Sequence, residues 1–330
     1  MTHIRRTVVA ALVTGLMVTT VGAAGASFPG QPTVAFVRYN GSDYRVIEMR
    51  PNGTEEHRVL GPESKAAFYS AAMSPDGRRV AVSIYDGSQY DLWTKRLDGN
   101  LRQVTDTPNR DEHSPAWTPD GDTIVFMESD GVSYAAIVRR DADGSRRRQL
   151  YWTDQDFLMY PTVSPDGDRV LFSAPRLGAP ARGMADYDLV TMRLDGTGRR
   201  WLTDDDTRNQ IAGDWSPDGE RVAFLIEQVL KPRPAFGGGL TPGTPVPAGT
   251  APVQPVYSMS ADGGGRRLIT EKPGIVGHVL YTPDGSRVMF ARFSSVSMDL
   301  YSTPVDGGVL KPLTETIKTY NSFDLFGLPA

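Results

Sequence analysis

Short runs of apolar and alternating residues recur from residue 33 almost to the end of the chain, and each is bounded by Gly, Pro or Asp. β-branched and aromatic residues dominate these runs, a composition typical of strands. No stretch between them has the spacing of an amphipathic helix. The pattern therefore predicts an all-β protein, with its most regular runs at 79–84, 123–127, 169–173, 221–226 and 287–291.

Two turn signals alternate with these runs. Proline presets φ at the second position of a turn, and glycine accepts the positive φ that a tight reversal needs, so each signal predicts a hairpin turn. The longer signal is a Ser/Thr-Pro-Asp-Gly tetrapeptide beginning at Ser74, Thr118, Ser164, Ser216 and Thr282, and the shorter is an Asn/Asp-Gly pair beginning at Asn52, Asp98, Asp143, Asp195, Asp262 and Asp306.

The spacing of the signals defines a structural repeat. Four of the Asp-Gly aspartates lie 22 or 23 residues before the next Pro-Asp-Gly aspartate, whereas the reverse interval varies from 22 to 44 residues. One repeat holds four predicted strands, which matches the blade of a β-propeller. The repeats predict a signal peptide at 1–26 followed by one six-bladed β-propeller of four-stranded antiparallel blades over residues 27–330.

The ends of the repeat array are unequal. Blade 1 has three predicted strands, at 33–37, 44–48 and 57–60, and one predicted strand at 320–326 is left over at the C-terminus. We expect this C-terminal strand to join blade 1 as its innermost strand, because that closes the ring and removes an exposed sheet edge. A frayed terminus is the alternative.

The order strand, Ser-Pro-Asp-Gly, strand, strand, Asp-Gly, Arg-x-Leu-Thr resembles the repeat of TolB-like six-bladed propellers and is similar to repeats in the propellers of prolyl-oligopeptidase-type peptidases. The resemblance covers residues 31–327 and implies the fold. It also implies a partner of envelope proteins, since TolB-like propellers are known in that role. We expect this chain to lack the α/β domain that TolB carries ahead of its propeller, and fold alone does not settle function.

The first 26 residues have the features of an export signal. Arg5 and Arg6 precede an uncharged run, and Ala24-Gly25-Ala26 has the small-x-small pattern of a signal-peptidase site. A retained membrane anchor is the alternative, although the run is short for a span of about 20 residues. The chain has no cysteine, which excludes disulfides and a lipoprotein anchor. We expect a periplasmic, cell-envelope or extracellular protein, and a monomer.

The charge balance bears on the class of partner. The chain carries a formal net charge of −4, and removal of the two N-terminal arginines makes it −6. Nucleic-acid binding requires a basic surface, so this balance argues against it. Arg146, Arg147 and Arg148 form a basic run, but they follow a predicted outer turn, where charge discourages strand addition.

Catalytic and cofactor motifs are missing from the sequence. It contains no Gly-x-Ser-x-Gly, His-Glu-x-x-His, phosphate-binding glycine loop or acid-rich calcium loop. The histidines after the signal, His57, His113 and His278, fall in different blades, which disfavours a three-histidine metal site. We expect no cofactor and no metal, with calcium at the acidic runs 154–156 or 204–206 as an open alternative.

The insertions indicate which face of the propeller could bind a ligand. Both turn signals lie on one face, whereas the long connections 175–186 in blade 4 and 231–255 in blade 5 lie on the other. The second of these contains twelve Pro or Gly among 25 residues, and its only charges are Lys231 and Arg233. Functional loops concentrate on rigid scaffolds, although a connection without any role is the alternative.

The same face is predicted to carry the candidate ligand-binding residues. Links between blades begin with Thr-Asp or Thr-Glu, and with Asp111 and Glu112 they would ring the channel mouth with negative charge, which favours a cationic peptide or amine. Closer to the axis, rings and amides suited to a peptide or a sugar begin the inner strands: Tyr69, His113, Tyr160, Asn209, His278 and Asn321. Trp117 and Trp215 are expected to pack between blades.

These observations predict an exported, non-catalytic binding or scaffold propeller for an envelope protein, a peptide or a cell-wall glycan. One alternative is a propeller lyase or hydrolase acting on envelope carbohydrate or peptide. Another is a propeller subunit that gates a separate peptidase.

Overall fold

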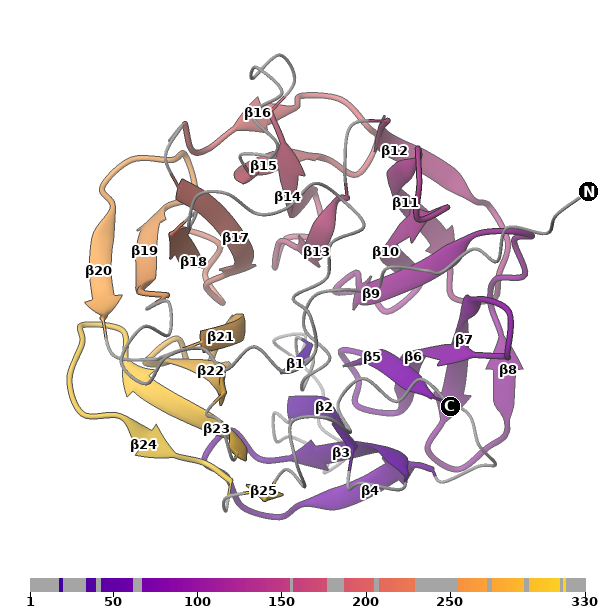
Figure 1. Cartoon of the computed structure of the whole chain (residues 1–330), viewed down its shortest axis with the longest axis horizontal. Helices are drawn as coiled ribbons and strands as arrows, with labels where there is room; N and C mark the ends of the chain where they lie inside the picture. Colours follow the sequence, from indigo (N-terminus) through magenta and orange to yellow (C-terminus); the bar gives the residue numbers. More distant parts are fainter. Residues whose placement is uncertain are drawn as a thin grey trace, which may run out of the picture.

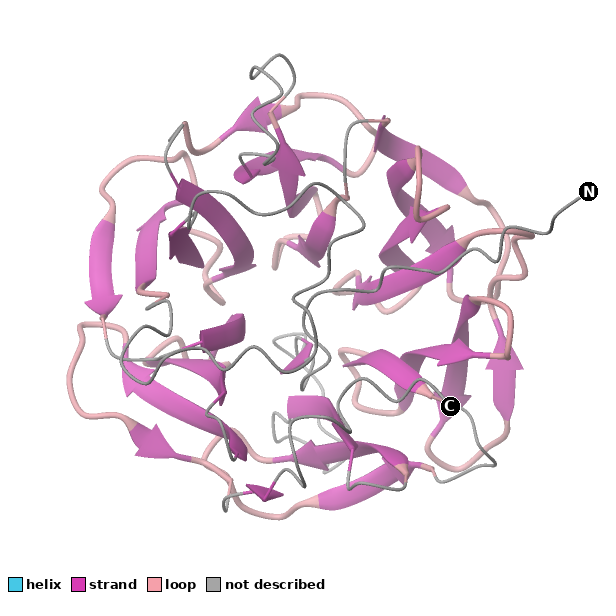
Figure 2. Cartoon of the chain, viewed as in Figure 1, coloured by secondary structure: helices cyan, strands magenta, loops and turns pink. Residues whose placement is uncertain are grey.

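The computed structural model is a ring of six small sheets around a central axis, and consecutive blades follow one another around the ring (Figure 1). The described residues are 18–19, 34–39, 43–61, 67–154, 157–176, 187–204, 208–228, 254–271, 275–293, 297–314 and 317–318. All regular structure within these ranges is strand (Figure 2). The predicted all-β, six-bladed fold is confirmed.

Each blade is an antiparallel sheet whose strands follow in chain order. Blade 1 holds β1 (Val18–Thr19), β2 (Val34–Tyr39), β3 (Tyr44–Met49) and β4 (His57–Leu60); blade 2 holds β5 (Phe68–Met73), β6 (Arg79–Tyr85), β7 (Tyr90–Arg96) and β8 (Leu101–Gln103); blade 3 holds β9 (Asp111–Trp117), β10 (Thr123–Ser129), β11 (Ala135–Asp141) and β12 (Arg148–Thr153). Blade 4 holds β13 (Met159–Val163), β14 (Arg169–Pro175), β15 (Tyr187–Arg193) and β16 (Arg200–Trp201); blade 5 holds β17 (Arg208–Trp215), β18 (Arg221–Gln228), β19 (Val256–Ser260) and β20 (Arg267–Thr270); blade 6 holds β21 (Ile275–Tyr281), β22 (Arg287–Phe293), β23 (Ser297–Pro304), β24 (Lys311–Pro312) and β25 (Ile317–Lys318), which also pairs with β23.

The tetrapeptide makes the same turn in every copy. In blade 2, the Ser74 hydroxyl donates to Asp76 at 2.5 Å and accepts from the backbone N–H of Arg79 at 2.9 Å. Gly77 has a φ of 65° and donates its N–H to the Ser74 carbonyl at 2.9 Å. The hydroxyl residue, the aspartate and the glycine are each required by a bond or an angle here, which explains why these residue types recur at the innermost hairpin of blades 2 to 6.

The core is equally repetitive. Five blades place a phenylalanine of the second strand at 0% exposure, namely Phe36, Phe126, Phe172, Phe224 and Phe290. Between blades 2 and 3, Trp117 is 7% exposed and its indole N–H donates to the Ala72 carbonyl at 3.0 Å. Trp215 is 5% exposed and packs in one cluster with Leu171 and Leu189 of blade 4. The prediction that both tryptophans pack between blades is confirmed.

Blade 1 differs from the sequence-based expectation in which strand is innermost. Its innermost strand is β1, where Val18 pairs with Phe36 and Thr19 with Ala35, and β1 lies near the axis (Figure 1). The predicted closing strand at 320–326 lies outside the described residues. In the full chain, Ala35 and Phe36 of β2 are therefore paired with residues from the segment predicted to be an export signal.

Candidate functional site

The long connections lie where the sequence predicts them. The first joins β14 to β15 and the second joins β18 to β19, the second and third strands of their blades, and these strands meet the connections at the ends opposite the tetrapeptide turns. Most residues of the two connections, including Lys231 and Arg233, lie outside the described residues, as does Asn321. The rest of this face, here called the channel face, is described by the hairpins of the other blades and the starts of the inner strands.

Four rings meet at the channel face between blades 2 and 3. The centroid of the Tyr69 ring is 4.4 Å from that of His113 and 5.6 Å from that of Tyr90. The Tyr90 ring is in turn 4.9 Å from His113 and 5.0 Å from Tyr85, which is 38% exposed. These four residues form the aromatic cluster, which runs from the start of two inner strands to the β6–β7 hairpin tip. The sequence predicted Tyr69 and His113 but missed Tyr85 and Tyr90, whose position at both ends of one hairpin was the available signal.

Asp111 and Asn209 act as links between neighbouring blades. The Asp111 carboxylate accepts the backbone N–H of Tyr90 at 2.8 Å, and the Asn209 side chain accepts that of Tyr187 at 3.1 Å. The two residues hold equivalent positions, seven before the turn serine or threonine. Each therefore fixes the third strand of the preceding blade, a structural task the sequence did not reveal. Burial raises the pKa of Asp111, with the nearby Asp91 carboxylate adding to the rise.

Glu112 is not part of an exposed ring of negative charge, because it is 0% exposed. Its Oε2 accepts the hydroxyl of Thr105 at 2.9 Å, and the side chain of Thr107 also hydrogen-bonds this carboxyl group. A hydrogen bond also joins Glu112 to the buried Asp91. Two ionised carboxylates cannot share a hydrogen bond, so Glu112 supplies the proton. Burial raises the pKa of Glu112 to about 9, and the side chain is neutral at pH 7.

The other predicted ring residues face the axis from the opposite blades. Tyr160 of blade 4 and His278 of blade 6 make an edge contact with centroids 5.1 Å apart, and Tyr69 packs against the apolar cluster that includes Tyr160. Burial lowers the pKa of His278 to about 4 and that of His113 to about 3, so both imidazoles are neutral at pH 7. The structure thus brings Tyr69 to His113 and Tyr160 to His278 as two pairs.

Residues 155–156 and 205–206 of the two acidic runs lie outside the described residues. In the part of the chain that is described, no group of three histidines or carboxylates could hold a metal ion. The Asp204 carboxylate instead forms an ion pair with Arg176, whose Nε also lies 3.3 Å from the buried Asp188. The threonines that precede these acids have a structural role as well: the Thr203 hydroxyl accepts the N–H of Leu189 at 2.9 Å and donates to Asp188 at 2.6 Å.

Known proteins share both the sequence and the architecture of this chain. A segment of 139 residues is 30% identical to the Tol-Pal system protein TolB of Anaeromyxobacter dehalogenans (strain 2CP-C); it spans 42% of this chain but 25% of that protein. The crystal structure of TolB from Acinetobacter baumannii superposes with a TM-score of 0.65 at 17% identity, covering 83% of this chain and 61% of that one. An oligogalacturonate lyase in complex with manganese superposes with a TM-score of 0.56 at 14% identity, covering 91% and 84%.

The structural likenesses are below 25% identity and show a shared propeller fold alone. The sequence comparison is more specific, because a family model described as the TolB beta propeller domain matches residues 26–233. That match spans more than half of the chain, and it includes four of the five tetrapeptide turns. The chain belongs to the TolB beta propeller family.

Proposed function

We propose that this chain is an exported, non-catalytic binding propeller whose channel face holds a protein or peptide of the cell envelope. The observation that carries this proposal is the aromatic cluster. Its rings offer apolar faces at a rigid channel mouth, and tyrosines combine such a face with a hydroxyl that can hydrogen-bond a ligand. The relatives named as Tol-Pal system proteins support an envelope role, although the segment shared with the first of them is a quarter of that protein.

The charges at this face favour a ligand different from the one expected from the sequence. Glu112 is neutral and buried, and Asp111 is engaged with the backbone of blade 2. The negative potential at the channel mouth is therefore weaker than the number of carboxylates suggests. A peptide that offers apolar and hydrogen-bonding groups fits this face better than a cationic amine.

The one serine–histidine contact of the cluster supports binding in preference to hydrolysis. The Ser83 hydroxyl lies 3.3 Å from Nδ1 of His113, but Ser83 is 0% exposed and donates to the Glu112 carbonyl at 2.7 Å. In blade 4, the equivalent Ser173 accepts the N–H of Ala212 of the next blade at 3.3 Å. A histidine with a pKa of about 3 is also a poor general base at neutral pH. The pair is better explained as blade-to-blade bonding than as a nucleophile with its base.

Replacement of Tyr85 by Ala should weaken capture of the envelope partner at least tenfold, because it removes the exposed ring of the aromatic cluster. The measurement compares partner recovery by the immobilised full chain and by Tyr85→Ala from a solubilised envelope fraction. Val309→Ala is the matched control, since Val309 is an 85% exposed apolar residue on the opposite face. Equal losses in both variants, or a loss in the control alone, would contradict the assignment of the channel face.

Export is a separate part of the proposal and rests on Ala24-Gly25-Ala26. We predict that the exported form begins at Ser27, which N-terminal sequencing of the protein recovered from the envelope or the medium would establish. Cleavage there would remove β1 and leave the inner edge of β2 open for another strand, for which 320–326 is the candidate. Recovery of a chain that still begins near Met1 would point to a membrane anchor. Among the described residues, no helix is long and apolar enough to cross a membrane.

A further inference from the structure

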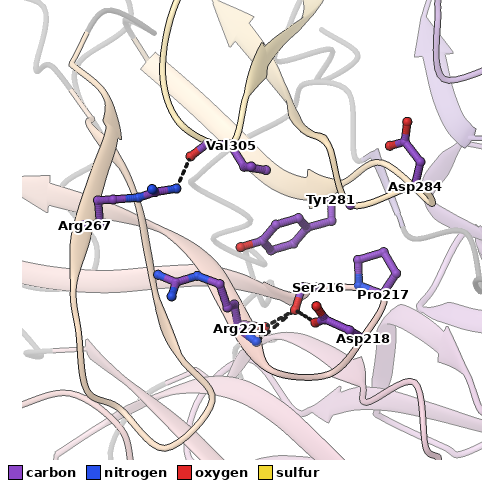
Figure 3. A pocket seen from close by; sticks show the side chains of 9 residues that line it. Ser216, Pro217, Asp218, Arg221, Arg267, Tyr281, Asp284 and Val305 are labelled. Carbon is purple, nitrogen blue, oxygen red and sulfur yellow. Dashed lines mark hydrogen bonds between the residues drawn. The ribbon is translucent and has the colours of Figure 1, made fainter.

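A cavity of about 190 Å³ lies between blades 5 and 6 on the face opposite the channel face (Figure 3). The Ser-Pro-Asp-Gly turn of blade 5 and the Asp284-Gly285 pair of blade 6 form part of its wall. The remainder comes from the side chains of Arg221, Arg267, Tyr281 and Val305. The guanidinium of Arg221 and the ring of Tyr281 lie beside each other in this wall (Figure 3).

A tyrosine stands at this interface where the interface between blades 2 and 3 has a tryptophan. Between blades 2 and 3 this position is Trp117, and the Arg79 guanidinium lies 4.8 Å above its ring. Nη2 of Arg79 then donates to the carbonyl of Gly121, in the turn of the next blade, at 2.6 Å. Between blades 5 and 6 the position is Tyr281, which lines the cavity together with Arg221.

Nη2 of Arg221 lacks the bond that Nη2 of Arg79 and Nη2 of Arg287 make, although the Arg221 side chain also hydrogen-bonds Tyr281. Its Nε donates to Ser258 at 2.7 Å, just as Nε of Arg287 donates to Ser302 at 3.0 Å in blade 6. Nη2 of Arg287 also donates to the Ser302 carbonyl at 3.1 Å, but Nη2 of Arg221 is buried without a hydrogen-bond partner among the described residues. Buried polar groups in folded proteins are normally paired, so this donor in the cavity wall is available to an acceptor on a ligand.

The charges around the cavity restrict what that acceptor can be. Arg221 has no ion pair within the described part of the chain, whereas Arg267 is paired with Asp306 at 2.7 Å. Asp218 and Asp284 accept the hydroxyls of their own turns at 2.5 Å, and these bonds hold their pKa values below the usual range. Two ionised carboxylates at the rim disfavour a dianion, whereas a guanidinium without an ion pair favours a single negative charge.

We propose that this cavity binds a small monocarboxylate, one oxygen of which accepts the free N–H of Arg221 Nη2. The apolar part of such a ligand would contact Pro217 and Val305, which also line the cavity. The site lies on the opposite face from the aromatic cluster, so it adds a second ligand class to the proposed envelope function and does not depend on it.

The test is a titration of the ¹⁵N-labelled full chain with sodium acetate at constant ionic strength, followed through the backbone amide signals of Ser216 and Tyr281, which line the cavity and are present in every variant. We expect the shift to saturate with acetate. We also expect a longer monocarboxylate such as butyrate to compete with acetate for the cavity. Arg221→Met should raise the apparent Kd at least tenfold. Arg287→Met, which removes the equivalent arginine outside the cavity, should leave it unchanged.

The controls separate the alternatives. Glycerol that shifts the signals as acetate does would overturn the carboxylate assignment, and phosphate that binds more tightly than acetate would overturn the single-charge assignment. A linear, unsaturable response to acetate would rule out the site. If Arg221→Met does not fold, Arg221→Lys retains the charge without Nη2 and should show the same loss, and a crystal of the unaltered chain soaked in butyrate should show its carboxylate at Arg221.

Discussion

Truncation of one repeated phenylalanine, Phe290→Ala, should lower the free energy of unfolding by about 3–5 kcal/mol, the range for buried Phe→Ala changes. Phe290 is 0% exposed and packs in one cluster with Ala223 of blade 5 and Val279 of its own blade. The Tyr301 ring stacks 6.5 Å away, which limits how far the surroundings can close over the gap. The loss should exceed the value for simple transfer of the side chain, because a cavity remains.

Urea denaturation of the purified chain, followed by tryptophan fluorescence, measures this change. Val309→Ala serves as the control, because its 85% exposed side chain should contribute within about 0.5 kcal/mol. A loss below about 1 kcal/mol for Phe290→Ala would mean that blade 6 does not pack against blade 5 as described.

Stability should also fall steeply between neutral pH and about pH 9, owing to Glu112. Its folded-state pKa of about 9 lies far above the ordinary value of 4.5, so the folded chain holds a proton that the unfolded chain has released. Linkage then requires the free energy of unfolding to decrease as pH rises from about 4.5 to 9, by on the order of several kcal/mol.

Glu112→Gln should remove most of this alkaline loss. The glutamine amide can donate to Asp91 as the protonated acid does, and its oxygen can accept from Thr105. Thermal melts of both chains from pH 5 to pH 9.5 make the comparison. Parallel curves would show that Glu112 is ionised in the folded chain and would overturn the Glu112–Asp91 hydrogen bond.

Other buried groups act in different pH windows and can be separated from Glu112. Burial raises the pKa of Asp214 to about 7, so its contribution declines between about pH 4 and 7. His113 and His278 have pKa values below the ordinary value of 6.5, so they remove stability as pH falls below it. Only Glu112 titrates between neutral pH and about pH 9 among the acids whose pKa shift is given a value here.

The fold was accessible from the sequence because its turns are encoded locally. Ser74, Asp76 and Gly77 are each determined by contacts within six residues, and the same is true of every copy. Blade number follows from counting those copies. The innermost strand of blade 1 was less accessible, since it depends on which end of the chain reaches β2, and no local signal distinguishes 18–19 from 320–326.

The candidate site was only partly accessible because its chemistry depends on neighbouring blades. The position of His113 at the channel face followed from the repeat, but its contacts with Tyr69 and Tyr90 come from blade 2. The neutral state of Glu112 likewise reflects Asp91 and Thr105 across the blade junction. From the sequence alone, a carboxylate at this position is expected to be exposed to solvent. Only the packing of two blades shows that the Glu112 carboxyl group is buried.

The most direct test of the proposed function is photo-crosslinking in intact cells, with a crosslinking residue introduced either at Tyr85 on the channel face or at Asp143 on the turn face. Asp143 is a suitable reference because it lies in the exposed turn between β11 and β12 of blade 3. The account predicts a discrete adduct with an envelope protein from position 85 and none from position 143. An adduct from position 143 alone, or no adduct from position 85 while the folded chain is present in the envelope, would contradict it.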